Sequence, residues 1–159
     1  LIIKSFFHLN KYFPSWELIL VGDGKDKMKL INLINKLKLS HKVKIYNETQ
    51  DVEKFYLMSD LFIYPSRWEG FPNSLAEALS FGIPSIGLKN AEGVSNLVNN
   101  ENGWLAENDK DIYNKLKFAM ENPKIRLEKS NNAKKIIKEF NSKQIYKKWY
   151  YFFLTSLNE

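Results

Sequence analysis

Short apolar runs alternate with segments of helical periodicity along most of this 159-residue chain, and no other feature constrains its fold as strongly. A unit of strand, helix and strand joins parallel neighbours, so a succession of such units predicts a parallel sheet covered by helices. Strands are predicted over residues 16–21, 42–46, 61–64, 83–88 and 103–106. Helices are predicted over residues 25–39, 51–59, 73–81, 94–99 and 109–121.

The apolar side chains of these helices indicate which faces are buried. In the helix predicted after the first strand, Met28, Ile31 and Ile34 share one face. The next, shorter helix carries Phe55 and Tyr56 among its apolar residues.

The last part of the chain is predicted to be helical. Pro123 suits the first turn of a helix. Residues 142–157 carry Ile145, Trp149 and Phe152 at the spacing of a buried stripe, which predicts a final helix there.

Length and composition fit one domain. A chain of this size with 44% hydrophobic residues can bury a core of its own. The predicted fold class is α/β, a Rossmann-like three-layer domain over residues 1–159. It has a parallel sheet flanked by helices, and the C-terminal helices pack at the side.

Parallel sheets bind ligands beyond the carboxyl ends of their strands. The loops expected at that edge are residues 22–24, 46–50, 65–72 and 88–93. The third of these loops is the most informative. It contains Glu69 and leads into a helix that carries Glu77 in its first turn.

A helix beginning near Asn73 would present unpaired amide groups and the positive end of its dipole, which suits a phosphate. Gly70 would let a ligand approach the backbone closely, and Pro72 would stiffen that approach. A diphosphate is therefore predicted at the amide groups of Ser74 and Leu75.

The two glutamates each have two interpretations. The Glu77 carboxylate could accept hydrogen bonds from the vicinal hydroxyls of a ribose. However, Ser74 and Glu77 also match a capping box, and the local pattern alone favours that interpretation. Glu69 has no helix to cap, so it either contacts hydroxyls of a sugar or pairs at the surface with Arg67.

The spacing of Glu69 and Glu77, with Gly-Phe-Pro-Asn-Ser-Leu-Ala between them, resembles the donor-binding motif of family-4 retaining glycosyltransferases, which have the GT-B fold. Residues 18–24, 78–86 and 102–105 resemble further segments of the C-terminal, donor-binding domain of that family. The resemblance covers nearly the whole chain.

This resemblance implies specific roles for the motif. Glu69 would be the catalytic residue, facing the donor sugar near its anomeric carbon, and Glu77 would hold the ribose hydroxyls. The other donor-binding residues that it implies in this segment are Gly70, Phe71, Pro72, Asn73, Ser74 and Leu75.

The resemblance extends to two other loops. Gly22 and Gly24 match a glycine turn of the donor-binding domain, although such turns after strands are common. Tyr46 and Asn47 fall where such domains often line the pocket for the base, and packing at the end of a strand is the alternative for Tyr46.

The implied function is transfer of a hexosyl unit from a UDP-sugar to a polysaccharide or lipid-linked acceptor, as in the synthesis of bacterial surface glycans. No cofactor and no metal are expected. The implied partner is the N-terminal acceptor domain of the same full-length protein. That domain, the first strand and an arginine–lysine pair that grips the diphosphate are expected outside this chain, which by itself would be inactive.

Composition limits the other classes of function. The absence of cysteine excludes a disulfide framework and a thiolate metal site, and it fits a cytoplasmic location. Residues 124–148 contain nine Lys or Arg and two Glu, a net charge of +7, so the rest of the chain sums to −1. A solvated helix face explains this segment, as does peripheral attraction to the anionic inner face of the plasma membrane. No nucleic-acid-binding motif accompanies it, and no nucleic-acid partner is expected.

Two further functions stay open from the sequence. One is a non-catalytic nucleotide-binding module that docks on a membrane or a partner through its basic C-terminal helices. The other is a nucleotide-sugar epimerase with the GT-B fold.

Overall fold

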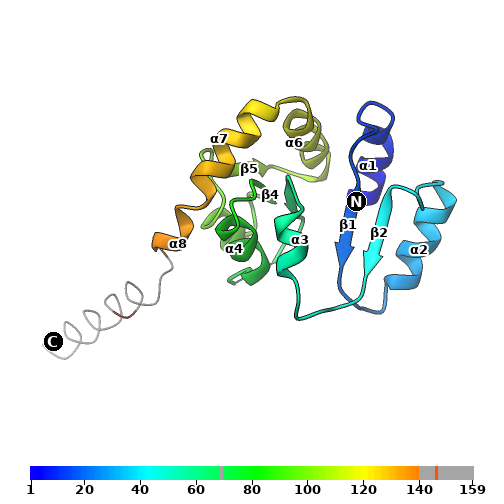
Figure 1. The fold of residues 1–159 in the computed structure, drawn as a ribbon, viewed down its shortest axis with the longest axis horizontal. Helices are drawn as coiled ribbons and strands as arrows, with labels where there is room; N and C mark the ends of the chain where they lie inside the picture. The colour runs from blue at the N-terminus through cyan, green and yellow to red at the C-terminus, as the bar shows by residue number, and fades with distance from the viewer. Residues whose placement is uncertain (69, 140–145, 147–159) are drawn as a thin grey trace, which may run out of the picture.

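The computed structural model describes residues 1–68, 70–139 and 146 (Figure 1). Strands and helices alternate through most of this range. The elements are α1 (Ile2–Asn10), β1 (Leu18–Val21), α2 (Lys27–Lys36), β2 (Val43–Tyr46), α3 (Glu53–Leu57), β3 (Phe62–Tyr64), α4 (Asn73–Ser80), β4 (Ser85–Leu88), α5 (Glu92–Ser95), β5 (Gly103–Ala106), α6 (Asp109–Glu121), α7 (Pro123–Ala133) and α8 (Ile136–Glu139).

The strands are parallel, as predicted, but they form two sheets and not one. β1 pairs with β2, so that Leu18 lies opposite Val43. β3, β4 and β5 form a second sheet in that order, in which Ile86 lies between Ile63 and Trp104. Consecutive strands become neighbours in most proteins but not always. Here the connection from β2 to β3 leads into a separate sheet.

Helices cover both faces of the three-stranded sheet, which confirms the three-layer arrangement. α6 packs on β4 and β5 on one face, and α4 and α5 pack on the other face. Side chains alternate accordingly along the strands, because Ile86 and Ala106 face α6 while Tyr64 and Leu105 join the cluster of α4 and α5. α7 packs at the side, against α4 and α6.

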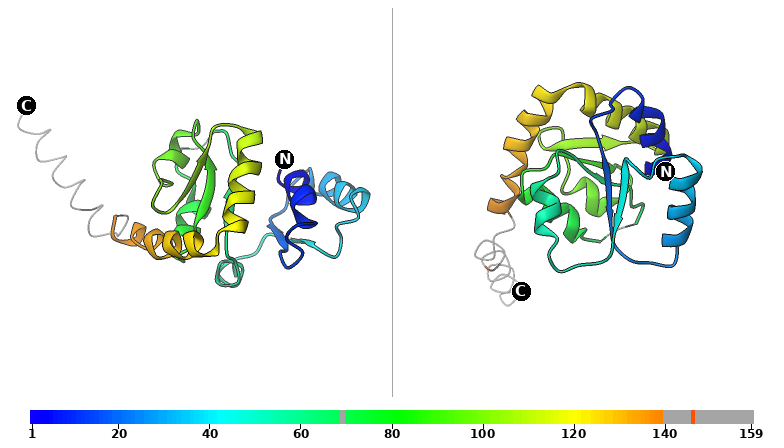
Figure 2. Two further views of the ribbon diagram at one scale, coloured as in Figure 1. Left: turned by 90° about the horizontal axis from the view of Figure 1, so that it is seen from above. Right: turned by 45° about the vertical axis from the view of Figure 1, so that its right-hand side comes forward.

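The two-stranded sheet shares a core with the rest of the molecule. α1 contacts α6, and buried side chains of α1, α2 and β2 belong to the same cluster as those of β4, β5 and α6. Figure 2 shows this sheet with α1 and α2 beside the larger group of elements.

Three details differ from the sequence prediction. In α2, Ile34 is buried, but Met28 is 63% exposed, so the predicted apolar face is wrong at that position. α5 covers Glu92–Ser95 and not residues 94–99. The predicted final helix over residues 142–157 lies outside the described residues, except for Tyr146.

Candidate functional site

Helix α4 begins at the end of the loop that carries the two-glutamate motif. Its N-cap is Pro72, in an extended conformation (φ −83°, ψ 92°), and no side chain caps this helix end. The Leu75 amide donates to the Pro72 carbonyl over 3.1 Å. Within the described part of the chain, the amide groups of Asn73 and Ser74 have no hydrogen-bond acceptor. The open donors are therefore those of Asn73 and Ser74, not of Ser74 and Leu75 as predicted.

Glu77 projects from the first turn of α4 as an exposed side chain. Its Oε2 atom accepts a hydrogen bond from the Tyr56 hydroxyl over 2.9 Å. A capping box would require Ser74 as the N-cap, but Pro72 holds that position, so the capping interpretation of Glu77 is wrong. Because residues three and four positions apart share a helix face, Glu77 lies on the same side of α4 as Ser74 and Asn73.

Helix α3 connects this helix end to the end of strand β2. Its Phe55 ring contacts the Tyr46 ring, with 4.8 Å between ring centroids, and its Tyr56 contacts Glu77. Tyr46 is still 40% exposed, so strand-end packing and a solvent-facing ring occur together at this position. Adjacent residues of one short helix thus hold two of the predicted donor-binding side chains.

The glycine turn after β1 is linked to the loop after β2. Gly22 has a φ of +141°, a conformation that glycine adopts readily, whereas Gly24 has no positive φ. Between them, Asp23 accepts hydrogen bonds from the Lys27 ammonium group and, over 2.8 Å, from the Glu48 amide. The hydrogen bond from Lys27, followed by that from Glu48, lowers the pKa of Asp23 below its ordinary value.

The same lysine reaches the other predicted base-pocket residue. The Lys27 ammonium group donates to the side-chain oxygen of Asn47 as well as to Asp23. This bridge fixes the two loops relative to each other at the carboxyl ends of β1 and β2.

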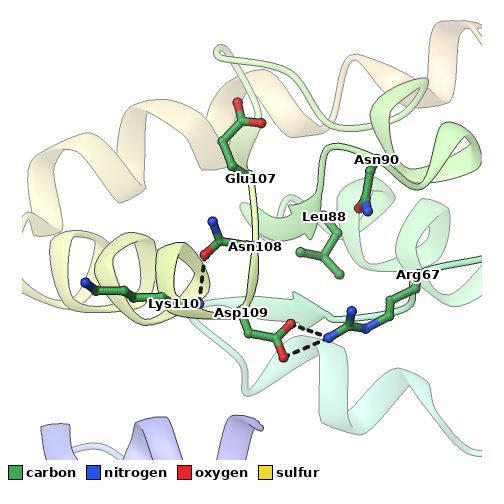
Figure 3. Close-up of a pocket in the computed structure, with 7 residues that line it drawn as sticks. All are labelled: Arg67, Leu88, Asn90, Glu107, Asn108, Asp109 and Lys110. Atoms are coloured by element: carbon green, nitrogen blue, oxygen red, sulfur yellow. Dashed lines mark hydrogen bonds and ion pairs between the residues drawn. The ribbon is translucent and has the colours of Figure 1, made fainter.

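A pocket of about 320 Å³ lies at the carboxyl ends of β4 and β5, next to the motif loop (Figure 3). Arg67 of that loop and Asp109 of α6 form a bidentate ion pair along one side of it, with distances of 2.7 and 2.8 Å. The pocket is lined by Arg67, Leu88, Asn90, Glu107, Asn108, Asp109 and Lys110. The pair ties the motif loop to α6.

The predicted catalytic residue, Glu69, lies outside the described residues, and so does its predicted surface pair with Arg67. Its neighbour Gly70 has open space where a Cβ atom would stand, since no atom lies within 4 Å of that point. Phe71 is 49% exposed, and Pro72 is fully buried.

The sequence analysis did not find the partners of these residues. Tyr56 was assigned to an apolar helix face, and Asp23, Lys27 and Asp109 received no role. A signal for Tyr56 was present, because a tyrosine on a buried helix face usually needs a hydrogen-bond partner for its hydroxyl. No comparable signal exists for Lys27 and Asp109, whose partners lie on other loops.

The described residues contain no group of three or more His, Cys, Asp or Glu side chains that could hold a metal ion. Some basic residues of the C-terminal segment are engaged in packing. Arg126 lies over the Trp16 ring, with 4.8 Å to its centroid, and Lys129 lies 4.9 Å from the centroid of Trp104. Burial lowers the pKa of Lys129. The solvated-face interpretation is therefore incomplete for this segment.

Three comparisons place the chain among known proteins. The family model of glycosyl transferases group 1 matches residues 1–136. An uncharacterized glycosyltransferase of Haemophilus influenzae is 30% identical over 151 residues, which are 93% of this chain and 43% of that protein. A galactosyltransferase of Escherichia coli, named as UDP-Gal:alpha-D-GlcNAc-diphosphoundecaprenol alpha-1,3-galactosyltransferase, is 32% identical over 136 residues, 83% of this chain and 35% of that protein.

Solved structures agree with these relatives. The crystal structure of TarM of S. aureus in complex with UDP superposes with a TM-score of 0.85 at 25% identity, covering 96% of this chain and 32% of TarM. The fold is that of the GT-B glycosyltransferases. This chain spans less than half the length of the curated relatives named above. None of the described helices is both long and apolar enough to span a bilayer.

Proposed function

Because this chain belongs to the group 1 glycosyl transferases, we propose that it binds the nucleotide-sugar donor of a retaining glycosyltransferase. The donor in this proposal is a UDP-sugar, bound at the carboxyl ends of the strands. A hexosyl unit then passes to a hydroxyl of a polysaccharide or lipid-linked acceptor. The acceptor would be held by an N-terminal domain of the full-length protein.

One observation carries this proposal. The first turn of α4 presents two open amide groups, at Asn73 and Ser74, on the same side as the Glu77 carboxylate. Amide donors at the positive end of a helix suit a diphosphate. A carboxylate one turn further along can accept both hydroxyls of a ribose. The two groups are therefore spaced for adjacent parts of one nucleotide.

The rest of the motif would handle the sugar. We place Glu69 near its anomeric carbon, and the open space at Gly70 lets the ligand approach the backbone. In the transfer step, the bond between the anomeric carbon and the diphosphate oxygen breaks. A new bond forms from the same face to the acceptor oxygen, whose proton leaves with the diphosphate.

The names of the relatives support the choice of substrates. The E. coli relative is named for UDP-Gal and for an acceptor on diphosphoundecaprenol, and the TarM structure contains UDP. A lipid-linked acceptor would place the reaction at the inner face of the plasma membrane. These relatives favour a transferase over an epimerase or a module without chemistry.

Calorimetric titration of the protein in its natural length with UDP tests the proposal. Replacing Glu77 by Ala should weaken UDP binding about tenfold or more, because hydrogen bonds to a charged group contribute about 1.5–3 kcal/mol. Replacing the exposed Glu128 of α7 by Ala is the matched control and should leave the affinity unchanged. Equal affinities of the wild type and Glu77→Ala would refute the proposed site.

A further inference from the structure

Tyr56 is held rigidly by aromatic packing beneath the proposed nucleotide site. It is only 9% exposed. Its ring stacks on Phe81, with 5.3 Å between centroids and an interplanar angle of 26°, and meets Phe62 edge-on at 6.1 Å. Ala78 and Ile83 complete this cluster. The position of the hydroxyl is therefore set by the core and not by the solvent.

That hydroxyl has one strong acceptor. It donates to Glu77 Oε2 over 2.9 Å, while the Ser74 carbonyl oxygen lies at 3.3 Å. Burial raises the pKa of Tyr56 above its ordinary value, and the Glu77 carboxylate raises it further, so the hydroxyl keeps its proton at neutral pH. Tyr56 is thus a permanent donor to a carboxylate.

The contact fixes one end of an exposed side chain. A glutamate on a helix surface otherwise samples several rotamers, and a ligand that binds it must order them. Oε2 is bound to Tyr56, while no described group contacts Oε1. The carboxylate therefore presents a free oxygen in one orientation, on the side of α4 where the amides of Asn73 and Ser74 are open.

We infer that Tyr56 is a positioning residue for nucleotide recognition, whose hydroxyl orients Glu77 toward the vicinal hydroxyls of the ribose. The inference rests on the proposed function, because it requires that Glu77 bind a ribose. It makes Tyr56 responsible for recognition of the ribose, not of the diphosphate.

The test is a double-mutant cycle read with two nucleotides. UDP and 2′-deoxy-UDP are titrated calorimetrically into the wild type, Tyr56→Phe, Glu77→Ala and the double variant, all in the natural length of the protein. The Tyr56→Phe variant keeps the ring and its packing, and its melting temperature is recorded with each titration. Tyr113→Phe, in a half-buried tyrosine of α6, is the matched control.

Tyr56→Phe should weaken UDP binding about fivefold, which corresponds to about 1 kcal/mol. It should change the affinity for 2′-deoxy-UDP less than about twofold, because that ligand lacks the diol. In the Glu77→Ala background, the same substitution should have no further effect on UDP. Tyr113→Phe should bind both nucleotides as the wild type does.

Three results would overturn the inference, and they differ in what they imply. If Glu77→Ala leaves UDP binding unchanged, the proposed function fails together with the inference. If Glu77→Ala weakens binding but Tyr56→Phe does not, only the inference fails. If Tyr56→Phe weakens both nucleotides equally, or acts equally without Glu77, then Tyr56 acts through the fold and not by positioning Glu77.

Discussion

Glu77 has a role that its own neighbours in the sequence leave undecided. The pattern of Ser74 and Glu77 fits both a capping box and a ligand-binding carboxylate. The groups that decide between them are Pro72, which holds the N-cap position, and Tyr56, which lies 21 positions away. Local patterns can thus place a residue on a helix, but its hydrogen-bond partner depends on packing between elements.

Gly103 is a residue for which packing allows no side chain. A Cβ atom built there would lie 2.2 Å from the Ser85 carbonyl oxygen of the neighbouring strand and 2.9 Å from a methyl carbon of Val98. We expect Gly103→Ala to lower the free energy of unfolding by about 1–3 kcal/mol, because a strand or a core helix must move. Urea unfolding monitored by circular dichroism measures this loss.

Gly24 supplies the matched control for that substitution. A Cβ atom at Gly24 meets no atom within 4 Å, and its φ is not positive. Gly24→Ala should therefore change the unfolding free energy by less than about 0.5 kcal/mol. Equal losses in both variants would show that the close contact at Gly103 does not limit the fold.

Among the elements, the strands could be predicted more reliably than the contacts between loops. Buried parallel strands need short, continuous apolar runs, which is why β2, β3 and β5 were found within one residue of their observed bounds. The bridge from Lys27 to Asp23 and Asn47 could not be predicted, since it depends on two loops meeting in space.

This bridge should make stability depend on pH. The pKa of Asp23 is lowered in the folded state, mainly by its hydrogen bond to Lys27. A carboxyl group with a lowered pKa stabilises the fold above its unfolded pKa of about 4 and loses this contribution as the pH falls through the folded value. Asp23→Asn should therefore be less stable than the wild type at pH 7, with a smaller difference at pH 3.

Thermal unfolding at the two pH values checks this expectation. Glu53→Gln, in an exposed carboxylate of α3, is the control and should behave like the wild type at both. A deficit of Asp23→Asn that is equally large at pH 3 would contradict the assigned role of the ion pair.

For the whole molecule, composition indicated the size of the domain and the position of its basic segment, but not how its sheets divide. The alternation of strands and helices gives the parallel direction, whereas the separation of β1 and β2 from the other strands depends on the path of one connection. The basic residues also could not be classed by sequence, because charge alone does not reveal which side chains pack.

Arg126 shows how a basic residue can join distant parts of this molecule. It lies over the Trp16 ring and donates to the carbonyl oxygens of Ala119 and Met120 at the end of α6. Replacing it by Ala should cost about 1–3 kcal/mol of unfolding free energy, through the lost cation–π contact and hydrogen bonds. Lys124→Ala, in an exposed residue of the same helix, should cost less than about 0.5 kcal/mol.

Urea unfolding of the two variants distinguishes a packed arginine from a solvated one. If Arg126→Ala were as stable as Lys124→Ala, the contacts with Trp16 and α6 would contribute nothing to the fold. The basic segment would then act only as a charged surface.

The central claim is that the amino end of α4 and Glu77 bind adjacent parts of one nucleotide. A crystal structure of the protein in its natural length, grown with UDP, tests it most directly. We expect the diphosphate within hydrogen-bond distance of the Asn73 and Ser74 amides, with both ribose hydroxyls on the Glu77 carboxylate. A nucleotide bound elsewhere, with Glu77 contacting Tyr56 alone, would contradict the account.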